Sequence, residues 1–135
     1  MRIEDLKKRL NESINLIDES IEKGLVERQR TIGFNTSAAC ADMLEIFLHK
    51  KDLIDIGFFI KHEWLKSKNI VEEKFPFDFP RKKEILDLIF KIEEKRNVLC
   101  YGKPQKEYTI NEVLDNFNKL KKIFKEVEEN EFSNI

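Results

Sequence analysis

Helix-breaking residues are scarce in this chain, and their scarcity limits the folds that it can adopt. The 135 residues include four glycines and three prolines, so the segments between them are long. Within these segments apolar residues recur every three or four positions, which is the period of an α-helix with one buried face. We therefore predict an all-α protein, a single domain over residues 1–135 built as an up-and-down bundle of four long helices with one short extra helix.

The first two long helices are expected to differ in how much of their surface is apolar. The first should run from Ile3 to about Arg30, with a single apolar stripe that passes Gly24. Gly33 interrupts this pattern. Three residues beyond it are candidates for the N-cap of the next helix: Asn35, Thr36 and Ser37. That helix, over residues 38–49, is apolar around most of its circumference, so we expect it at the centre of the bundle.

The middle of the chain is less regular. A short helix is expected over Phe58–Ser67, with Trp64 as its packing anchor. The stretch Phe75–Pro80 cannot be helical, because each of its two prolines disfavours the helical conformation at the residue before it. Its three phenylalanines should instead hold this loop against the bundle.

Two further long helices complete the predicted bundle. Pro80 suits the first turn of the third, which should end at Tyr101 because a glycine and then a proline follow it. The fourth is expected to open with the capping box Thr109–Glu112. A frayed tail is expected from about residue 128.

Composition excludes several classes of protein. The chain has 25 basic and 26 acidic residues and a net charge of −1, so any nucleic-acid site must be a local patch. Cys40 and Cys100 lie in apolar settings without a CxxC motif, which excludes a disulfide framework or a zinc finger; we expect no metal and no cofactor. The chain has neither a signal-peptide core nor a bilayer-length apolar run, so we expect a cytoplasmic protein without membrane contact. Its bias toward Lys and Glu is typical of hyperthermophile proteins.

One charged residue departs from the apolar stripe of the third long helix. Arg96 follows Ile92 by four residues and precedes Leu99 by three, so it lies on the same face of the helix as these apolar residues. The helical period therefore directs its guanidinium toward a seam between helices. Asn97 and Tyr101 are four residues apart and share a face. An arginine, an amide and a phenol at one helix end could bind and polarise a phosphate. Alternatively, Arg96 extends to solvent or pairs with a carboxylate of another helix.

Other polar residues are candidates for supporting roles. Three lysines add positive charge around the same helix end: Lys95, Lys103 and Lys106. Asp42 and Glu45 of the central helix could bond neighbouring helices or pair with Arg96. With His49 the same carboxylates could form half of a metal site, but no second Glu-x-x-His helix completes it. His62 follows an apolar run and either reaches a cleft or lies at the surface.

The segment from Arg96 to Gly102, RNVLCYG, resembles the signature of HEPN domains at the end of the third long helix. The stretch from Asn35 to Glu45 also resembles the second helix of that family, so the likeness spans nearly the whole chain. The resemblance implies a dimeric, HEPN-like helical bundle. Many such proteins are metal-independent ribonucleases, often toxins paired with a minimal nucleotidyltransferase, and others bind nucleotides without cutting RNA.

The resemblance also implies roles for individual residues. Arg96 would stabilise the pentacovalent phosphate, Asn97 would orient the ribose 2′-hydroxyl, and Tyr101 stands where the family has a histidine. A phenol keeps its proton at neutral pH, so we expect Tyr101 to act as a weak acid or base and RNA cleavage to be feeble or absent.

Two interpretations of the function follow. In the first, the chain is a homodimer with a cleft that faces RNA or a nucleotide phosphate, possessing weak or degenerate ribonuclease activity of the toxin–antitoxin type. In the second, it is a non-catalytic interaction or nucleotide-binding module that pairs with a nucleotidyltransferase-like partner. The net charge of −1 and the missing histidine favour the second interpretation, whereas the arginine on the helix seam favours an anion site.

Overall fold

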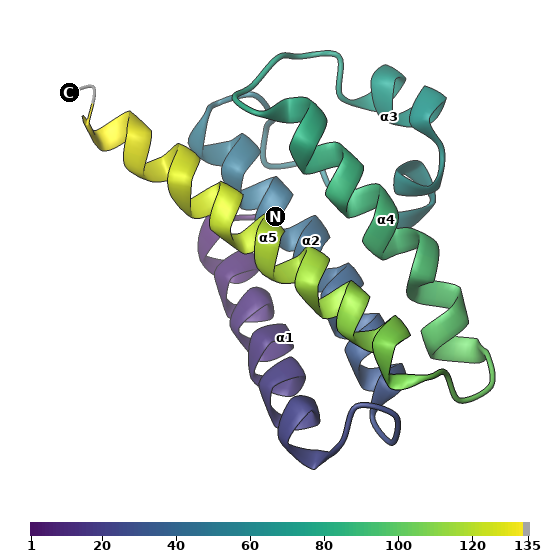
Figure 1. Cartoon of the computed structure of the whole chain (residues 1–135). Coiled ribbons are helices and arrows are strands. Elements are labelled where there is room, and N and C mark those ends of the chain that lie inside the picture. Colours follow the sequence, from purple (N-terminus) through teal and green to yellow (C-terminus); the bar gives the residue numbers. More distant parts are fainter. Residues whose placement is uncertain (134–135) are drawn as a thin grey trace.

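A computed structural model describes residues 1–133 of the chain, with side chains as far as Glu129. Four long helices make the bundle: α1 (Ile3–Lys23), α2 (Gln29–Lys50), α4 (Lys82–Tyr101) and α5 (Glu107–Ser133). Between α2 and α4 lie the 3₁₀ helix η1 (His62–Lys66) and the short helix α3 (Lys68–Lys74) (Figure 1). The prediction of an all-α bundle of four long helices is confirmed, and two short helical segments stand where one was expected.

Helix α2 is the central helix, as its composition predicts. It packs against α1, α4 and α5, and every residue from Ala39 to Leu48 is buried. Figure 1 shows α2 behind α5, between α1 and α4. The other three long helices contribute apolar residues to the core around it.

The boundary between the first two helices differs from the prediction. Helix α1 ends at Lys23, because Gly24 adopts a φ of 133° that lies outside the helical region and that an L side chain rarely tolerates. Helix α2 then begins at Gln29, so Gly33 lies inside it. The expected N-cap residues are inside it too, where Asn35 and Thr36 donate to carbonyls of the preceding turn.

Gly33 has a packing role rather than a helix-ending one. A Cβ atom at this position would lie 2.7 Å from the Leu99 Cβ and 3.1 Å from the Cys100 Sγ. Both neighbours belong to the last turns of α4, so the absence of a side chain at Gly33 allows α2 and α4 to approach closely. This contact joins the start of α2 to the end of α4.

The segment between α2 and α4 agrees with the prediction in one part and differs in another. Phe75 and Phe79 are buried, and the Lys82 ammonium group donates to the carbonyls of Phe75 and Phe77, so the phenylalanine loop is held against the bundle as expected. The short helix expected over Phe58–Ser67 is smaller, because residues 58–61 are not helical and the backbone N–H of Ile60 donates to the buried carboxylate of Glu45.

The ends of α4 and α5 also test the predicted boundaries. Pro80 precedes α4 rather than opening it, because Arg81 adopts a left-handed conformation with a φ of 57° just before the first turn. The end of α4 at Tyr101 is confirmed, with the N–H of Gly102 bonded to the Val98 carbonyl. Helix α5 begins at Glu107, before the expected capping box, and continues past residue 128 to Ser133, while residues 134–135 lie outside the described part.

Candidate functional site

A buried glutamine fixes the end of α4 against the start of α2. The Gln29 Nε2 donates to the carbonyls of Leu99 (3.3 Å) and Lys103 (3.2 Å), and its Oε1 accepts from the N–H of Gln105 (2.7 Å). These bonds satisfy carbonyls that lack partners within the helix. Sequence reasoning missed Gln29, and the one signal for it was the rarity of glutamine, which occurs twice in the chain.

Two arginines and two aromatic rings meet beside this junction. We call them the arginine–aromatic cluster: Arg30, Phe34, Arg96 and Tyr101. The Phe34 and Tyr101 rings lie edge to face with their centroids 5.8 Å apart. The Arg96 guanidinium carbon is 5.1 Å from the Phe34 centroid, and that of Arg30 is 5.8 Å from the Phe34 centroid and 5.9 Å from the Tyr101 centroid. Cation–π attraction therefore holds both positive charges near the Phe34 ring.

Neither arginine of the cluster forms an ion pair with a described carboxylate, although the Arg96 charge lowers the pKa of the buried Glu93 one turn away on α4. Among the residues whose side chains are described, neither Arg30 nor Arg96 has an ion-pair partner, whereas Arg9 pairs with Asp42 at 3.3 Å. The Nε of Arg96 is buried without a hydrogen-bond partner, which is costly for a charged donor. The expectation that Asp42 or Glu45 pairs with Arg96 is not met, because Asp42 binds Arg9 and Glu45 binds the N–H of Ile60.

The remaining predicted site residues form no hydrogen bond with the cluster within the described region. Asn97 is exposed and Lys95 is half-buried, both on α4. Lys103 and Lys106 are exposed in the connection between α4 and α5. Tyr101 is 66% exposed. The structure thus joins Arg96 and Tyr101 through Phe34, and the other candidates lie at the same helix end.

The acidic residues of α2 do not form a metal site. Burial raises the pKa of Asp42 to about 6, although the Arg9 guanidinium partly opposes this shift. The Nε2 of His49 is buried and has no hydrogen-bond partner. Within the described residues no group of three His, Cys, Asp or Glu side chains could hold a metal ion.

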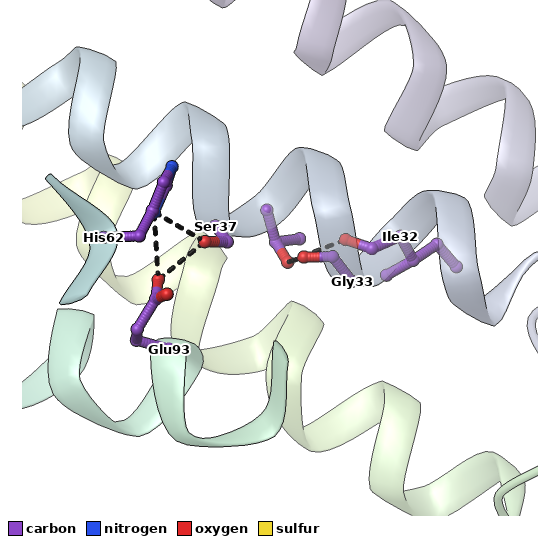
Figure 2. A network of polar contacts seen from close by, with 6 residues as sticks. Ile32, Gly33, Ser37, His62 and Glu93 are labelled. Carbon is purple, nitrogen blue, oxygen red and sulfur yellow. Dashed lines mark hydrogen bonds and ion pairs between the residues drawn. The ribbon is translucent and has the colours of Figure 1, made fainter. Parts of the chain in front are cut away.

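His62 lies in a buried polar network rather than free at the surface. We call it the Ser37–His62–Glu93 network (Figure 2). The His62 Nδ1 is 3.1 Å from the Ser37 Oγ and 3.4 Å from the Glu93 Oε2, and the Ser37 hydroxyl donates to that same oxygen at 2.6 Å. Burial opposes ionisation of Glu93, but hydrogen bonds from His62 and Ser37 and the charges of His62 and Arg96 outweigh it and lower its pKa.

Sequence reasoning missed Glu93, although its spacing is informative. Glu93 follows Ile89 by four residues and precedes Arg96 by three, so the buried stripe of α4 carries two adjacent charges rather than one. Ser37 was considered as a helix cap and not as a buried partner of that carboxylate. Glu93 on α4 and Ser37 on α2 are far apart in sequence, so the apolar spacing of neither helix predicts their contact.

The cluster and the network lie along one seam between α2 and α4. Phe34 contacts Arg96, and one turn further along α2 Ser37 bonds Glu93, which is one turn before Arg96 on α4. The two helices are antiparallel neighbours, so these contacts follow one another in order. The seam therefore carries the buried Glu93 carboxylate one helical turn from Arg96.

No protein-family model, curated protein or solved structure matches this chain. The fold and the site define it as an all-α helical bundle with an exposed arginine–aromatic cluster at one end of its α2–α4 seam. In the part of the chain that the structure describes, no helix has an apolar stretch long enough to cross a bilayer.

Proposed function

We propose that this chain is a HEPN-like RNA-binding protein that contacts single-stranded RNA through the arginine–aromatic cluster. The observation that carries the proposal is the convergence of Arg30 and Arg96 on the Phe34 ring, with no ion-pair partner for either among the described side chains. Guanidinium groups bind phosphates through charge-assisted hydrogen bonds, and bases stack on exposed aromatic rings. One strand of RNA offers both groups at short spacing.

The surroundings of the cluster support a strand rather than a single nucleotide as the ligand. Lys103 and Lys106 are exposed just beyond the end of α4, so positive charge continues past the cluster. A chain with a net charge of −1 attracts RNA by such a local patch and not by its total charge. The HEPN resemblance adds the proposal of a homodimer in which two clusters face one cleft.

A second candidate is an interaction module that pairs with a nucleotidyltransferase-like partner. Ile56 and Phe59, in the connection between α2 and η1, are 63% and 58% exposed. Large apolar side chains that one chain leaves uncovered are typical of contact surfaces. In this interpretation the partner covers these side chains.

Fluorescence anisotropy of a labelled single-stranded RNA in EDTA tests the RNA proposal. We expect Tyr101→Ala to weaken binding by about tenfold, because stacking on one aromatic ring contributes about 1–3 kcal/mol. Phe59→Ala, in the connection between α2 and η1, is the matched control, since Phe59 and Tyr101 are exposed to a similar degree, at 58% and 66%. Equal affinities for the wild type and both variants would contradict the proposal and favour the interaction module.

A further inference from the structure

We propose that the groove between α1 and α5 is a docking site for a partner protein that presents an acidic amphipathic helix. The groove lies over the last turns of α2, whereas the arginine–aromatic cluster lies near the start of that helix. The inference therefore goes beyond RNA binding and does not depend on it. Three observations carry it: how α1 is attached to the bundle, the apolar floor of the groove, and the positive charge on its rim.

Helix α1 is attached to the bundle through a single neighbour. Among the described elements it packs extensively against α2 alone, whereas α2 also packs against α4 and α5. Helices α1 and α5 thus both lie against α2 (Figure 1), but they have no extensive contact with each other. The space between them is a groove whose floor is formed by α2.

The floor and the walls of this groove are apolar. Leu10 of α1, Met43 and Ile46 of α2, and Phe124 of α5 line a volume of about 270 Å³. Pockets for drug-sized ligands usually enclose roughly 300–1,000 Å³, so the groove suits a few apolar side chains of a larger partner better than a whole small molecule. Met43 is an adaptable floor residue, because its unbranched thioether side chain can take different shapes against different partners.

The apolar surface continues along α1 beyond the groove. Ile14 and Ile21 follow Leu10 by four and eleven residues, so all three lie on one flank of the helix. Ile14 is half-buried, and Ile21 is 46% exposed. From Leu10 to Ile21 the helix rises by about 17 Å, which is about three turns. An occupant that covers this flank is therefore elongated, and a helix with apolar anchors at i, i+3, i+4 and i+7 has the matching shape.

The rim of the groove carries positive charge that the chain neutralises only in part. Its charged residues are four lysines and one glutamate: Lys7, Lys50, Lys121, Lys125 and Glu128. Glu128 pairs with Lys50 at 3.1 Å, so the other three lysines have no ion-pair partner among the described side chains. Lys121 and Lys125 are four residues apart on α5, a spacing at which like charges repel. Carboxylates of a bound helix relieve this repulsion, so the rim complements an acidic partner.

Fluorescence anisotropy with synthetic peptides and the full chain tests the proposal. The probe is a labelled helical peptide with leucines at i, i+3, i+4 and i+7 and glutamates at most other positions. One control peptide has lysines in place of the glutamates, and the other has glutamines in place of the leucines. We expect the acidic leucine peptide to bind at least about tenfold more tightly than either control. Equal binding of the three peptides, or no binding of the probe, overturns the proposal.

Charge-reversal variants locate the binding surface. We expect Lys7→Glu/Lys125→Glu to weaken binding of the probe by about tenfold, because two attractive contacts become repulsive. Lys8→Glu/Lys122→Glu is the matched control, since it changes the net charge equally at two exposed lysines that do not line the groove. The control should bind like the wild type, and thermal unfolding checks that both variants fold. Equal weakening in both variants would show attraction to the chain as a whole and overturn the proposal.

The methyl group of Met43 reports on the floor of the groove without any change to the rim. The chain has two methionines, so Met43→Leu assigns the Met43 signal in ¹³C-methyl spectra by removing it. We expect the acidic leucine peptide to shift this signal in the wild type. A peptide that binds without shifting it overturns the assignment of the groove. Displacement of the bound peptide by single-stranded RNA would identify a nucleic-acid surface and would also overturn the proposal.

Discussion

Arg96 lies half-buried beside Phe34, and its surroundings determine how its removal affects stability. Its Nε has no hydrogen-bond partner, and no described carboxylate pairs with it. Loss of the arginine removes one of the charges that lower the pKa of Glu93, but this carboxylate keeps its hydrogen bonds to Ser37 and His62. A charge that lacks a structural partner, held at the edge of a seam, is an expected feature of a binding residue.

We predict that Arg96→Met leaves the free energy of unfolding unchanged or raises it by about 1 kcal/mol, since apolar volume replaces an unpaired charge. Urea denaturation at neutral pH measures the free energy of unfolding of the variant and of the wild type. Arg9→Met is the control, and it should lower stability because it removes the partner of the buried Asp42. A loss of about 3–5 kcal/mol in Arg96→Met would show that the arginine is half of a structural ion pair and contradict the proposed role.

Asp42 makes stability depend on pH. Its folded-state pKa of about 6 lies above its ordinary value of 3.8, mainly because it is buried. The folded state binds a proton on Asp42 more tightly than the unfolded state does. The protonated Asp42 therefore contributes fully to stability below about pH 4, and this contribution is lost as the pH rises to about 6. We predict that Asp42→Asn is more stable than the wild type at about pH 8, by about 1–3 kcal/mol, and that the difference shrinks at about pH 4.

Urea titrations of Asp42→Asn and of the wild type, each at about pH 4 and about pH 8, measure this difference in the free energy of unfolding. Glu93 titrates in the opposite sense, because its pKa is lowered in the folded state, so the comparison must be made between variant and wild type. Asp18→Asn, at an exposed position of α1, should show no such difference. A variant less stable than the wild type at the higher pH would mean that the ion pair with Arg9 outweighs the burial of Asp42.

At the scale of elements, periodicity predicts which helices exist better than where they end. The number of long helices and the central place of α2 follow from apolar spacing, which every residue of an element supports. The boundary between α1 and α2 depends instead on two glycines that look alike in sequence. Gly24 ends a helix through its positive φ, whereas Gly33 accommodates Leu99 and Cys100, a contact that the local sequence does not contain.

We predict that Gly33→Ala lowers the free energy of unfolding by about 1–3 kcal/mol, although alanine is the better helix former. Its new Cβ would lie 2.7 Å from the Leu99 Cβ, which is tied to the α4 backbone, so the two helices must separate. Gly57→Ala, at an exposed loop position with ordinary contact distances, is the control and should have little effect. If Gly33→Ala is as stable as the wild type, the close approach of α2 and α4 is not required.

The candidate site was partly predictable at this same scale. The helical period predicts Arg96 and Tyr101 near the end of one helix, and both lie near the end of α4. Arg30 and Phe34 join them across a contact between helices, whereas the apolar pattern predicts residue 30 at the end of the first helix. His62 lies in a segment without periodicity, so its contact with Glu93 depends on how the chain packs and not on a local pattern.

At the scale of the whole molecule, one end of the bundle leaves apolar side chains uncovered. Val98 in the last turn of α4 and Tyr108 in the first turn of α5 are exposed, at 36% and 68%. These residues flank the short connection between the two helices. A second copy of the chain would cover them in the proposed dimer.

We therefore predict that light scattering at micromolar concentration gives about twice the chain mass of 16.2 kDa. Val98→Glu should shift the mass toward that of one chain, because a charge would be buried in the contact. Ile56→Glu, at an exposed apolar position in the connection between α2 and η1, is the control and should leave the mass unchanged. A wild-type mass of one chain would contradict the shared cleft.

The salt dependence of RNA binding tests the central claim most directly, because it reports phosphate contacts at the two arginines. For single strands, the logarithm of the binding constant falls with the logarithm of salt concentration by about 0.7 per phosphate neutralised. If Arg30 and Arg96 each hold a phosphate, the double variant Arg30→Met/Arg96→Met should bind more weakly, with a slope smaller by about 1.4. The control Arg2→Met/Lys8→Met, which removes two exposed charges near the start of α1, should keep the wild-type slope. Equal slopes for the wild type and both double variants would contradict RNA binding at the arginine–aromatic cluster.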